Sequence, residues 1–160
     1  MRDGSAARIK RTASSTGTDS RQQSSETVYR LSNNGGLYEA LRQVSVSTKQ
    51  GDRSTADTAY YEPGVTGALV LARQSVSTTV KGSDGRETTE VNLYARAADG
   101  RVQENDAPQQ IKEQQIIERR KGPDGSVTET LSVRRPSVSD PKQLGGVQRI
   151  SETLCKGKCD

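Results

Sequence analysis

The sequence contains no histidine, phenylalanine or tryptophan, and it has one methionine and five tyrosines. Without histidine the chain lacks the commonest general base of enzymes, and its two cysteines fall short of the four ligands that zinc takes in structural sites. Tyrosine alone provides few rings on which nucleic-acid bases could stack. We therefore expect a protein that is not an enzyme and that uses no metal or cofactor.

Large apolar side chains are also scarce. Hydrophobic residues make up 29% of the 160 residues and aromatic residues 3%, whereas ordinary globular domains are roughly 45–50% apolar with glycine counted. Ordering one residue costs about 1–2 kcal/mol of backbone entropy, and burying a large apolar side chain contributes about 1.5–3 kcal/mol. Such a chain is either disordered or an extended β-structure ordered by backbone ladders and neighbouring copies. Its net charge of only +4 favours the β-structure.

Long hydrophobic runs are missing as well. No segment approaches the roughly 20 apolar residues of a membrane-spanning helix. Residues 1–11 lack the apolar centre of a signal peptide, so we expect that a leader has been removed or that the numbering begins inside a longer chain. Glycine-rich phosphate-binding motifs are absent too.

The clearest pattern in the chain is the stretch 75–101, which alternates in the way of β-strands. Val76 and Val80 alternate with serine and threonine, and Val91 and Leu93 alternate with glutamate and asparagine further on. Glycine and aspartate at 82–85 and again at 99–100 mark reversals of the chain. The stretch therefore predicts a strand, a tight turn, a second strand and a second turn.

Weaker copies of this stretch precede and follow it. Tyr29, Tyr61 and Tyr94 lie 32 and 33 residues apart, and glycine turns recur in the same order around them. A period near 33 residues is typical of repeat proteins. We predict six segments, namely an N-terminal extension 1–8, hairpin repeats at 9–43, 44–74, 75–110 and 111–150, the last with an irregular insertion, and a cysteine-containing tail 151–160.

The predicted fold class is all-β, with tandem β-hairpin repeats in an extended antiparallel sheet or a β-solenoid-like array that self-assembly orders. Strands that are polar on both faces specify register weakly and leave edges that invite pairing. We favour a strand over a short helix at 111–120, a loop at 103–110 and irregular structure around the prolines of 134–146. Residues 12–25 suit an arm that pairs with a neighbouring subunit.

The strand at 68–72 is the best candidate for burial on both faces. Eight residues are predicted to mediate packing and assembly: Leu69, Leu71, Tyr61, Val76, Val80, Val91, Leu93 and Tyr94.

The two cysteines, Cys155 and Cys159, lie close together at the end of the sequence. Four residues of extended chain span about 13 Å, whereas a disulfide needs Cα atoms about 4.4–6.8 Å apart, so a local bridge requires a reversal that Gly157 permits. We expect that local disulfide, with an intermolecular bridge and free thiols as alternatives. A disulfide indicates an oxidising compartment, and hence an extracellular or cell-surface protein.

Charge gives a weaker indication of partners. The isoelectric point of about 9.2 raises nucleic acid as a partner, but basic residues cluster only at 119–121 and 134–135 and are otherwise mixed with acidic ones. We therefore expect a solvated surface of mixed charge, with nucleic acid an unlikely partner. Asp52, Asp84 and Asp124 lie in glycine turns and are interpreted as turn formers rather than calcium ligands.

These features predict a structural subunit of an extracellular bacterial β-rich filament, matrix or surface assembly, joined to copies of itself by strand pairing. An adhesin-like β-repeat that binds surface glycans or proteins is one alternative, and a basic nucleic-acid-binding protein is another. Over residues 9–154 the serine- and threonine-rich hairpins are similar in style to bacterial surface and fibre repeats, without a diagnostic motif.

Overall fold

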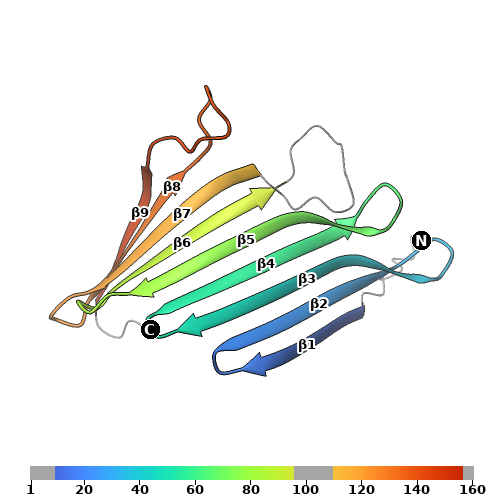
Figure 1. Cartoon of the computed structure of the whole chain (residues 1–160), viewed down its shortest axis with the longest axis horizontal. Helices are drawn as coiled ribbons and strands as arrows, with labels where there is room; N and C mark the ends of the chain where they lie inside the picture. The colour runs from blue at the N-terminus through green and yellow to red at the C-terminus, as the bar shows by residue number, and fades with distance from the viewer. Residues whose placement is uncertain (1–9, 96–109, 157–160) are drawn as a thin grey trace, which may run out of the picture.

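The computed structural model describes residues 10–95 and 110–156. In this part of the chain nine strands form one open antiparallel sheet, and no residue is helical. Each strand pairs with the next along the sequence, so the sheet order is the chain order (Figure 1). The predicted all-β fold class and its extended antiparallel sheet are confirmed. The described residues contain no helix of the length and apolarity needed to cross a membrane.

The strands are 8 to 14 residues long. Their bounds are β1 Lys10–Thr18, β2 Arg21–Leu31, β3 Leu37–Gln50, β4 Arg53–Pro63, β5 Leu69–Lys81, β6 Arg86–Ala95, β7 Gln110–Lys121, β8 Val127–Arg134 and β9 Gln148–Cys155.

Tight turns connect successive strands at one end of the sheet. Gly85 adopts a φ of 76°, and its N–H donates to the carbonyl of Gly82 over 3.1 Å. The Asp84 carboxylate accepts a hydrogen bond from the Arg86 N–H at 3.0 Å, which fixes the direction of the returning strand. The strand–turn–strand pattern predicted from 75–95 is therefore confirmed, whereas the turn predicted at 99–100 lies outside the described residues.

Cross-strand pairing assigns the side chains to two faces. One face carries Val76 with its direct neighbours Asp57 and Asn92, and we call it the Val76 face. The other carries Val133 with Gln115 directly opposite, and we call it the Val133 face. Apolar and polar residues are mixed on both faces, as the sequence predicts.

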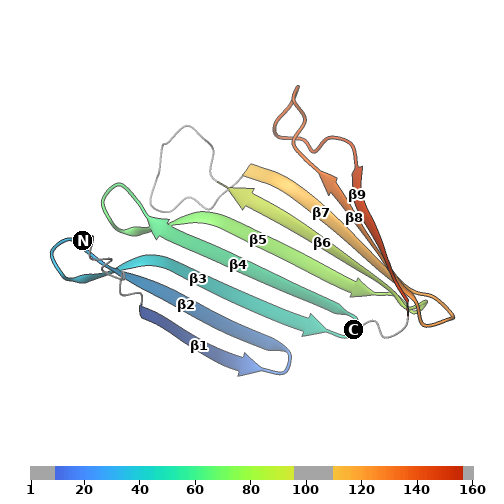
Figure 2. The ribbon, with the colours of Figure 1, turned by 180° about the vertical axis from the view of Figure 1, so that it is seen from behind.

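The sheet has almost no closed core. In the described part of the chain the buried hydrophobic residues are Val70, Val127 and Val133, and the buried polar residues are Thr27 and Gln114. No described side chain is less than 2% exposed. Seen from the front and from behind, no second layer of described residues covers either face (Figures 1 and 2). Most side chains therefore gain only partial burial, and the backbone ladders hold the sheet together.

Hydroxyl pairs reinforce neighbouring strands where apolar contacts are few. Ser45 and Thr58 face each other across β3 and β4 with their oxygens 2.9 Å apart, and Thr79 and Thr89 do the same across β5 and β6 at 2.9 Å. Cross-strand pairs of this kind contribute about 0.2–1 kcal/mol each. Serine and threonine thus add small increments of stability across neighbouring strands.

Register shifts recur in every second ladder. They occur at Val28/Tyr29, Tyr60/Tyr61, Leu93/Tyr94 and Leu131/Ser132, in the pairings β2–β3, β4–β5, β6–β7 and β8–β9. The other four ladders show no shift. A bulge increases the local twist, and the sheet is twisted, with β8 and β9 turned steeply relative to β1 to β5 (Figure 1).

Several local predictions can be compared with the strands. Residues 111–120 belong to β7, so the choice of strand over helix is confirmed. Irregular structure is predicted for 134–146; Arg134 ends β8, and residues 135–146 are irregular apart from an isolated bridge between Pro136 and Leu144. The segment 12–25 forms β1 and the first part of β2, and thus pairs within its own chain. Most of the predicted loop at 103–110 lies outside the described residues.

The burial expected on both faces at 68–72 is found on one face only. Val70 is 8% exposed, whereas Leu69 and Leu71 on the opposite face are half-buried. A single-layer sheet has no second layer to cover both faces, and this explains the difference.

We predict that Val133→Ala destabilises the sheet by about 1–2 kcal/mol, because two methyl-sized groups leave a site that is 4% exposed. Urea unfolding followed by circular dichroism measures this change. Val138→Ala is the matched control, since Val138 is fully exposed, and it should leave the midpoint unchanged. Equal midpoints for both variants would show that Val133 lies in no stabilising contact.

Candidate functional site

A polar network crosses the Val76 face over β6, β7 and β8. The amide nitrogen of Gln114 donates to the Glu90 carboxylate and to the Asn92 side-chain oxygen, both at 3.0 Å. Its amide oxygen accepts a hydrogen bond from Arg134 at 3.3 Å. These partners satisfy the polar atoms of the buried Gln114. The network is therefore well suited to fixing the register of three strands.

Two further contacts tie the irregular segment 135–147 to the neighbouring strands. Arg134 Nε donates to the carbonyl of Gly145 at 3.1 Å, and Arg135 forms an ion pair with Glu113 at 3.0 Å. The hydrogen bond from Gln115 lowers the pKa of Glu113, partial burial opposes this, and Arg135 lowers the pKa further. A carboxylate held ionised in this way suits an anchoring role.

The two outer strands differ in how well their edges are protected. Within the described residues, β1 and β9 each pair with one neighbour. β9 carries a bulge in its only ladder and an ion pair between Arg149 and Glu152 at 2.9 Å. β1 pairs with β2 without any register shift, and from Thr12 to Thr18 it has neither a charged residue nor proline. Bulges, charges and prolines are the usual devices that block edge pairing, so β1 from Thr12 to Thr18, beyond the basic Lys10 and Arg11, is the unprotected edge.

Hairpin geometry tells which backbone groups of β1 point outward. Thr18 and Arg21 flank a two-residue turn and form a pair that exchanges hydrogen bonds. Successive residues of a strand bond to opposite neighbours. In agreement with this, Ser20, which precedes Arg21, bonds toward β3: its carbonyl accepts a hydrogen bond from the Lys49 N–H at 2.8 Å. Every second residue counted back from Thr18 therefore bonds to β2. The residues between them, from Arg11 to Gly17, direct their N–H and C=O groups away from the sheet.

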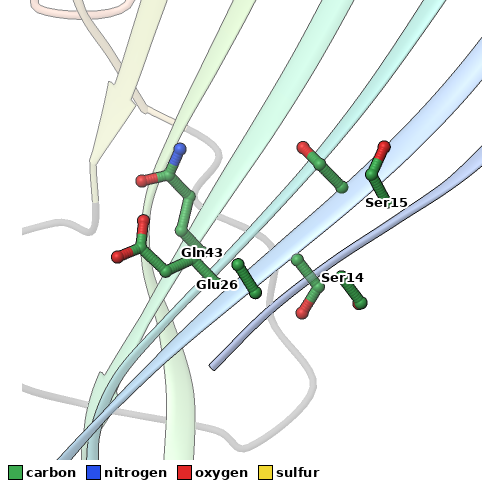
Figure 3. Close-up of a pocket in the computed structure, with 7 residues that line it drawn as sticks. Ser14, Ser15, Glu26 and Gln43 are labelled. Atoms are coloured by element: carbon green, nitrogen blue, oxygen red, sulfur yellow. The ribbon is translucent and has the colours of Figure 1, made fainter. Parts of the chain in front are cut away.

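A shallow hollow of about 350 Å³ lies beside this edge (Figure 3). Glu26 and Gln43 face each other across β2 and β3 and form one wall, and the small side chains of Ser14 and Ser15 lie on the side of β1. The full lining consists of Ala13, Ser14, Ser15, Ser24, Ser25, Glu26 and Gln43. Hydroxyl, amide and carboxylate groups here are able to bind a polar ligand, and no bulky side chain of this set overhangs β1.

A second hollow, of about 310 Å³, gathers basic residues near the tight turns of β5–β6 and β7–β8. Lys81, Arg86, Arg119 and Lys121 line it together with Glu87. Lys81 pairs with Glu87 at 3.5 Å, and Arg119 lies in register between Glu87 and Glu129. The positive charge of the 119–121 cluster is thus partly neutralised by neighbouring carboxylates.

Two of the three aspartates interpreted as turn formers, Asp84 and Asp124, accept a hydrogen bond from the backbone N–H two residues further along. Asp124 accepts a hydrogen bond from the N–H of Ser126 at 3.0 Å and another from its hydroxyl, and these bonds lower the pKa of Asp124. Asp84 makes the equivalent backbone contact in its turn. Among residues 10–95 and 110–156, no three cysteine, aspartate or glutamate side chains gather in a way that would hold a metal ion.

The predicted packing residues are divided between the faces. Tyr61 and Leu71 lie directly opposite each other, and Leu69 lies opposite Pro63. On the same Val76 face, register places Val76 beside Asp57, Val80 beside Arg53 and Tyr94 beside Gln74.

Val91 and Leu93 belong to the opposite, Val133 face, where Val91 faces Ser77 and Leu93 faces Ser75. The structure therefore brings together Tyr61 and Leu71 but not the set as a whole. Sequence reasoning missed Gln114 and Arg134, because β7 and β8 contain many other polar residues and nothing in the sequence distinguishes these two.

The cysteine prediction falls partly outside the described residues. Cys155 is the last residue of β9 and lies in register opposite Val127. Cys159 lies beyond the described part, so the disulfide between Cys155 and Cys159 stays a prediction.

We predict that Gly17→Ala loosens the β1–β2 hairpin. Gly17 has a φ of 156°, and a Cβ atom there would collide with the carbonyl oxygen of Arg21 and approach the Cα of Gln22 to 2.7 Å. The strain should cost about 1–3 kcal/mol and speed amide hydrogen exchange in β1.

Gly146→Ala is the control for this test, because a Cβ there meets no atom within 4 Å. Unchanged exchange in β1 of the Gly17→Ala protein would contradict the geometry of the hairpin.

The chain matches no known family model, no curated protein and no solved structure. The edge of β1, the hollow beside it and the single-layer sheet are the features of the described residues that bear on function.

Proposed function

We propose that this protein is a structural subunit that joins copies of itself by pairing strands at exposed sheet edges. The observation that carries the proposal is the unprotected edge of β1, where alternate residues between Arg11 and Gly17 direct their backbone groups outward. An added strand would satisfy these groups in the way that every inner strand of the sheet is already satisfied.

The weak core supports the same function. With Val70, Val127 and Val133 as its buried apolar residues, the described sheet depends on ladder hydrogen bonds. Extending the ladder with another copy would add stabilisation of the kind that the sheet already uses.

The repeated bulges support a tandem hairpin unit of about 33 residues. Three of the four register shifts fall at Tyr29, Tyr61 and Tyr94, the residues whose spacing suggested the repeat. A solenoid-like arrangement would require the sheet to turn on itself, and the open meander favours the extended sheet instead.

We place the assembly outside a bacterial cell, in a filament, matrix or surface layer. Support for this location comes from the predicted disulfide of Cys155 and Cys159 and from the serine- and threonine-rich hairpins.

An adhesin-like binding module is the second candidate, and the hollow between β1 and β3 favours it. Ser14, Ser15, Glu26 and Gln43 offer donors and acceptors to a sugar or peptide. A glycan array separates the two functions, since we expect the soluble chain of a pure building block to bind no glycan. Specific glycan binding that Glu26→Ala and Gln43→Ala abolish would favour the module.

We predict that Ser15→Pro reduces self-association at least about tenfold without unfolding the β1–β2 hairpin. Proline has no N–H to offer to an added strand, and Ser15 is one of the residues whose N–H points away from β2. Sedimentation velocity over a range of concentrations measures the association, and circular dichroism reports the fold.

Val65→Pro is the control substitution. Val65 is fully exposed and occupies the second position of a turn, where the Gly67 N–H bonds to the Gly64 carbonyl at 3.0 Å and proline is well tolerated. Assembly of the Ser15→Pro protein at the wild-type level would remove β1 as the joining edge.

A further inference from the structure

We propose that two copies join through β1 on both sides, as an antiparallel β1–β1 pair whose two-fold axis passes beside Ser14. The inference rests on the proposed function and specifies its joint. The strand that pairs with the β1 edge is thus β1 of a second copy of the chain.

The number of strands argues for this type of joint. In a nine-stranded meander β1 and β9 run in the same direction. If β9 of one copy joined β1 of another, with the Val76 faces of both copies on the same side, the two strands would therefore be parallel. All eight ladders between the described strands are antiparallel. A two-fold axis perpendicular to the sheet makes β1 antiparallel to β1 of the second copy. It also leaves the Val76 faces of both copies on the same side of the joined sheet. Antiparallel pairing is slightly more stable per residue, and purely antiparallel sheets are favoured over mixed ones.

The outward backbone groups select the register. They belong to Arg11, Ala13, Ser15 and Gly17, so pairing all of them requires Arg11 to face Gly17 of the second copy and Ala13 to face its Ser15. Ser14 then faces Ser14, in a pair without mutual backbone hydrogen bonds. Any other symmetric register leaves at least one outward residue unpaired.

Charge and size are compatible with the same register. It places Lys10 and Arg11 opposite Thr18 and Gly17, so no basic residue faces another across the joint. Between these ends the facing residues are alanine, serine and threonine, which fit closely. β9 fits the β1 edge less well, because Arg149, Glu152 and a bulge interrupt it.

A cysteine at position 14 tests the register in the full chain. Facing residues of such a non-hydrogen-bonded pair have Cα atoms about 4.5 Å apart, which suits a disulfide. After mild oxidation, we expect S14C to form a dimer linked through position 14 on both copies, identified by mass spectrometry of the cross-linked peptides. The exposed Ser14 tolerates this small change.

T16C is the matched control, since Thr16 is equally exposed and belongs to the same face of the same strand. In the proposed register its two copies lie about 13 Å apart along the strands, so S14C should give at least about tenfold more self-linked dimer than T16C. Cys155 and Cys159 are present in both proteins and cancel as background.

The outcomes separate the joint from the proposed function. If the wild-type chain stays monomeric by sedimentation at all concentrations, both the function and the joint are overturned. If it assembles but S14C links to Cys155 of another copy, or T16C links to itself as well as S14C does, the β1–β1 joint is wrong while strand pairing stands.

Discussion

The backbone hydrogen-bond ladder is the interaction on which the rest of this structure depends. A sheet with three buried hydrophobic residues among those described cannot rely on a packed interior. The backbone N–H and C=O groups of its inner strands are instead hydrogen-bonded to the strands on either side. Hydroxyl pairs such as Ser45 with Thr58 add small increments across the same ladders. A composition poor in large apolar residues is thus compatible with order, provided that each strand has partners.

Dependence on the ladder makes the position of each bulge important. The shifts in alternate ladders place an extra residue, for example Ala72, near the end of the sheet opposite the tight turns. Bulges twist a sheet and reduce the flat area available for stacking. A single-layer sheet that exposes both faces gains from this twist, because flat polar sheets stack readily.

Local features of the fold could be predicted from the sequence, because they depend on nearby residues. Glycine and aspartate at 82–85 specify a turn, and the alternation around Val76 and Val91 specifies strands. The faces were harder to assign. In a regular strand Leu71 and Arg73 would share a face, but the register shift at Tyr60/Tyr61 places them on opposite faces. The sequence around Leu71 does not predict that shift.

The candidate site depends still more on long-range register. Gln114 and Arg134 meet only because β7 and β8 pair with one particular alignment, and the contact to Gly145 needs the irregular segment to fold back. Sequence reasoning found the open edges as a class, from strands that are polar on both sides. It could not tell that β1 is open while β9 carries a bulge and an ion pair, because bulges follow from pairing.

The difference between the two edges bears on how far an assembly extends. A two-fold joint at β1 uses the same surface on both copies, and by itself it closes at a dimer. Growth beyond two copies then needs a second contact, and β9 is the remaining edge among the described strands. Exposed Ile150 and Leu154 there provide apolar surface. A strand added at this edge would also have to offer groups that complement the charges of Arg149 and Glu152. In the proposed assembly, the uncharged part of β1 would therefore form the first joint, and the charged edge of β9 would be the one left for growth.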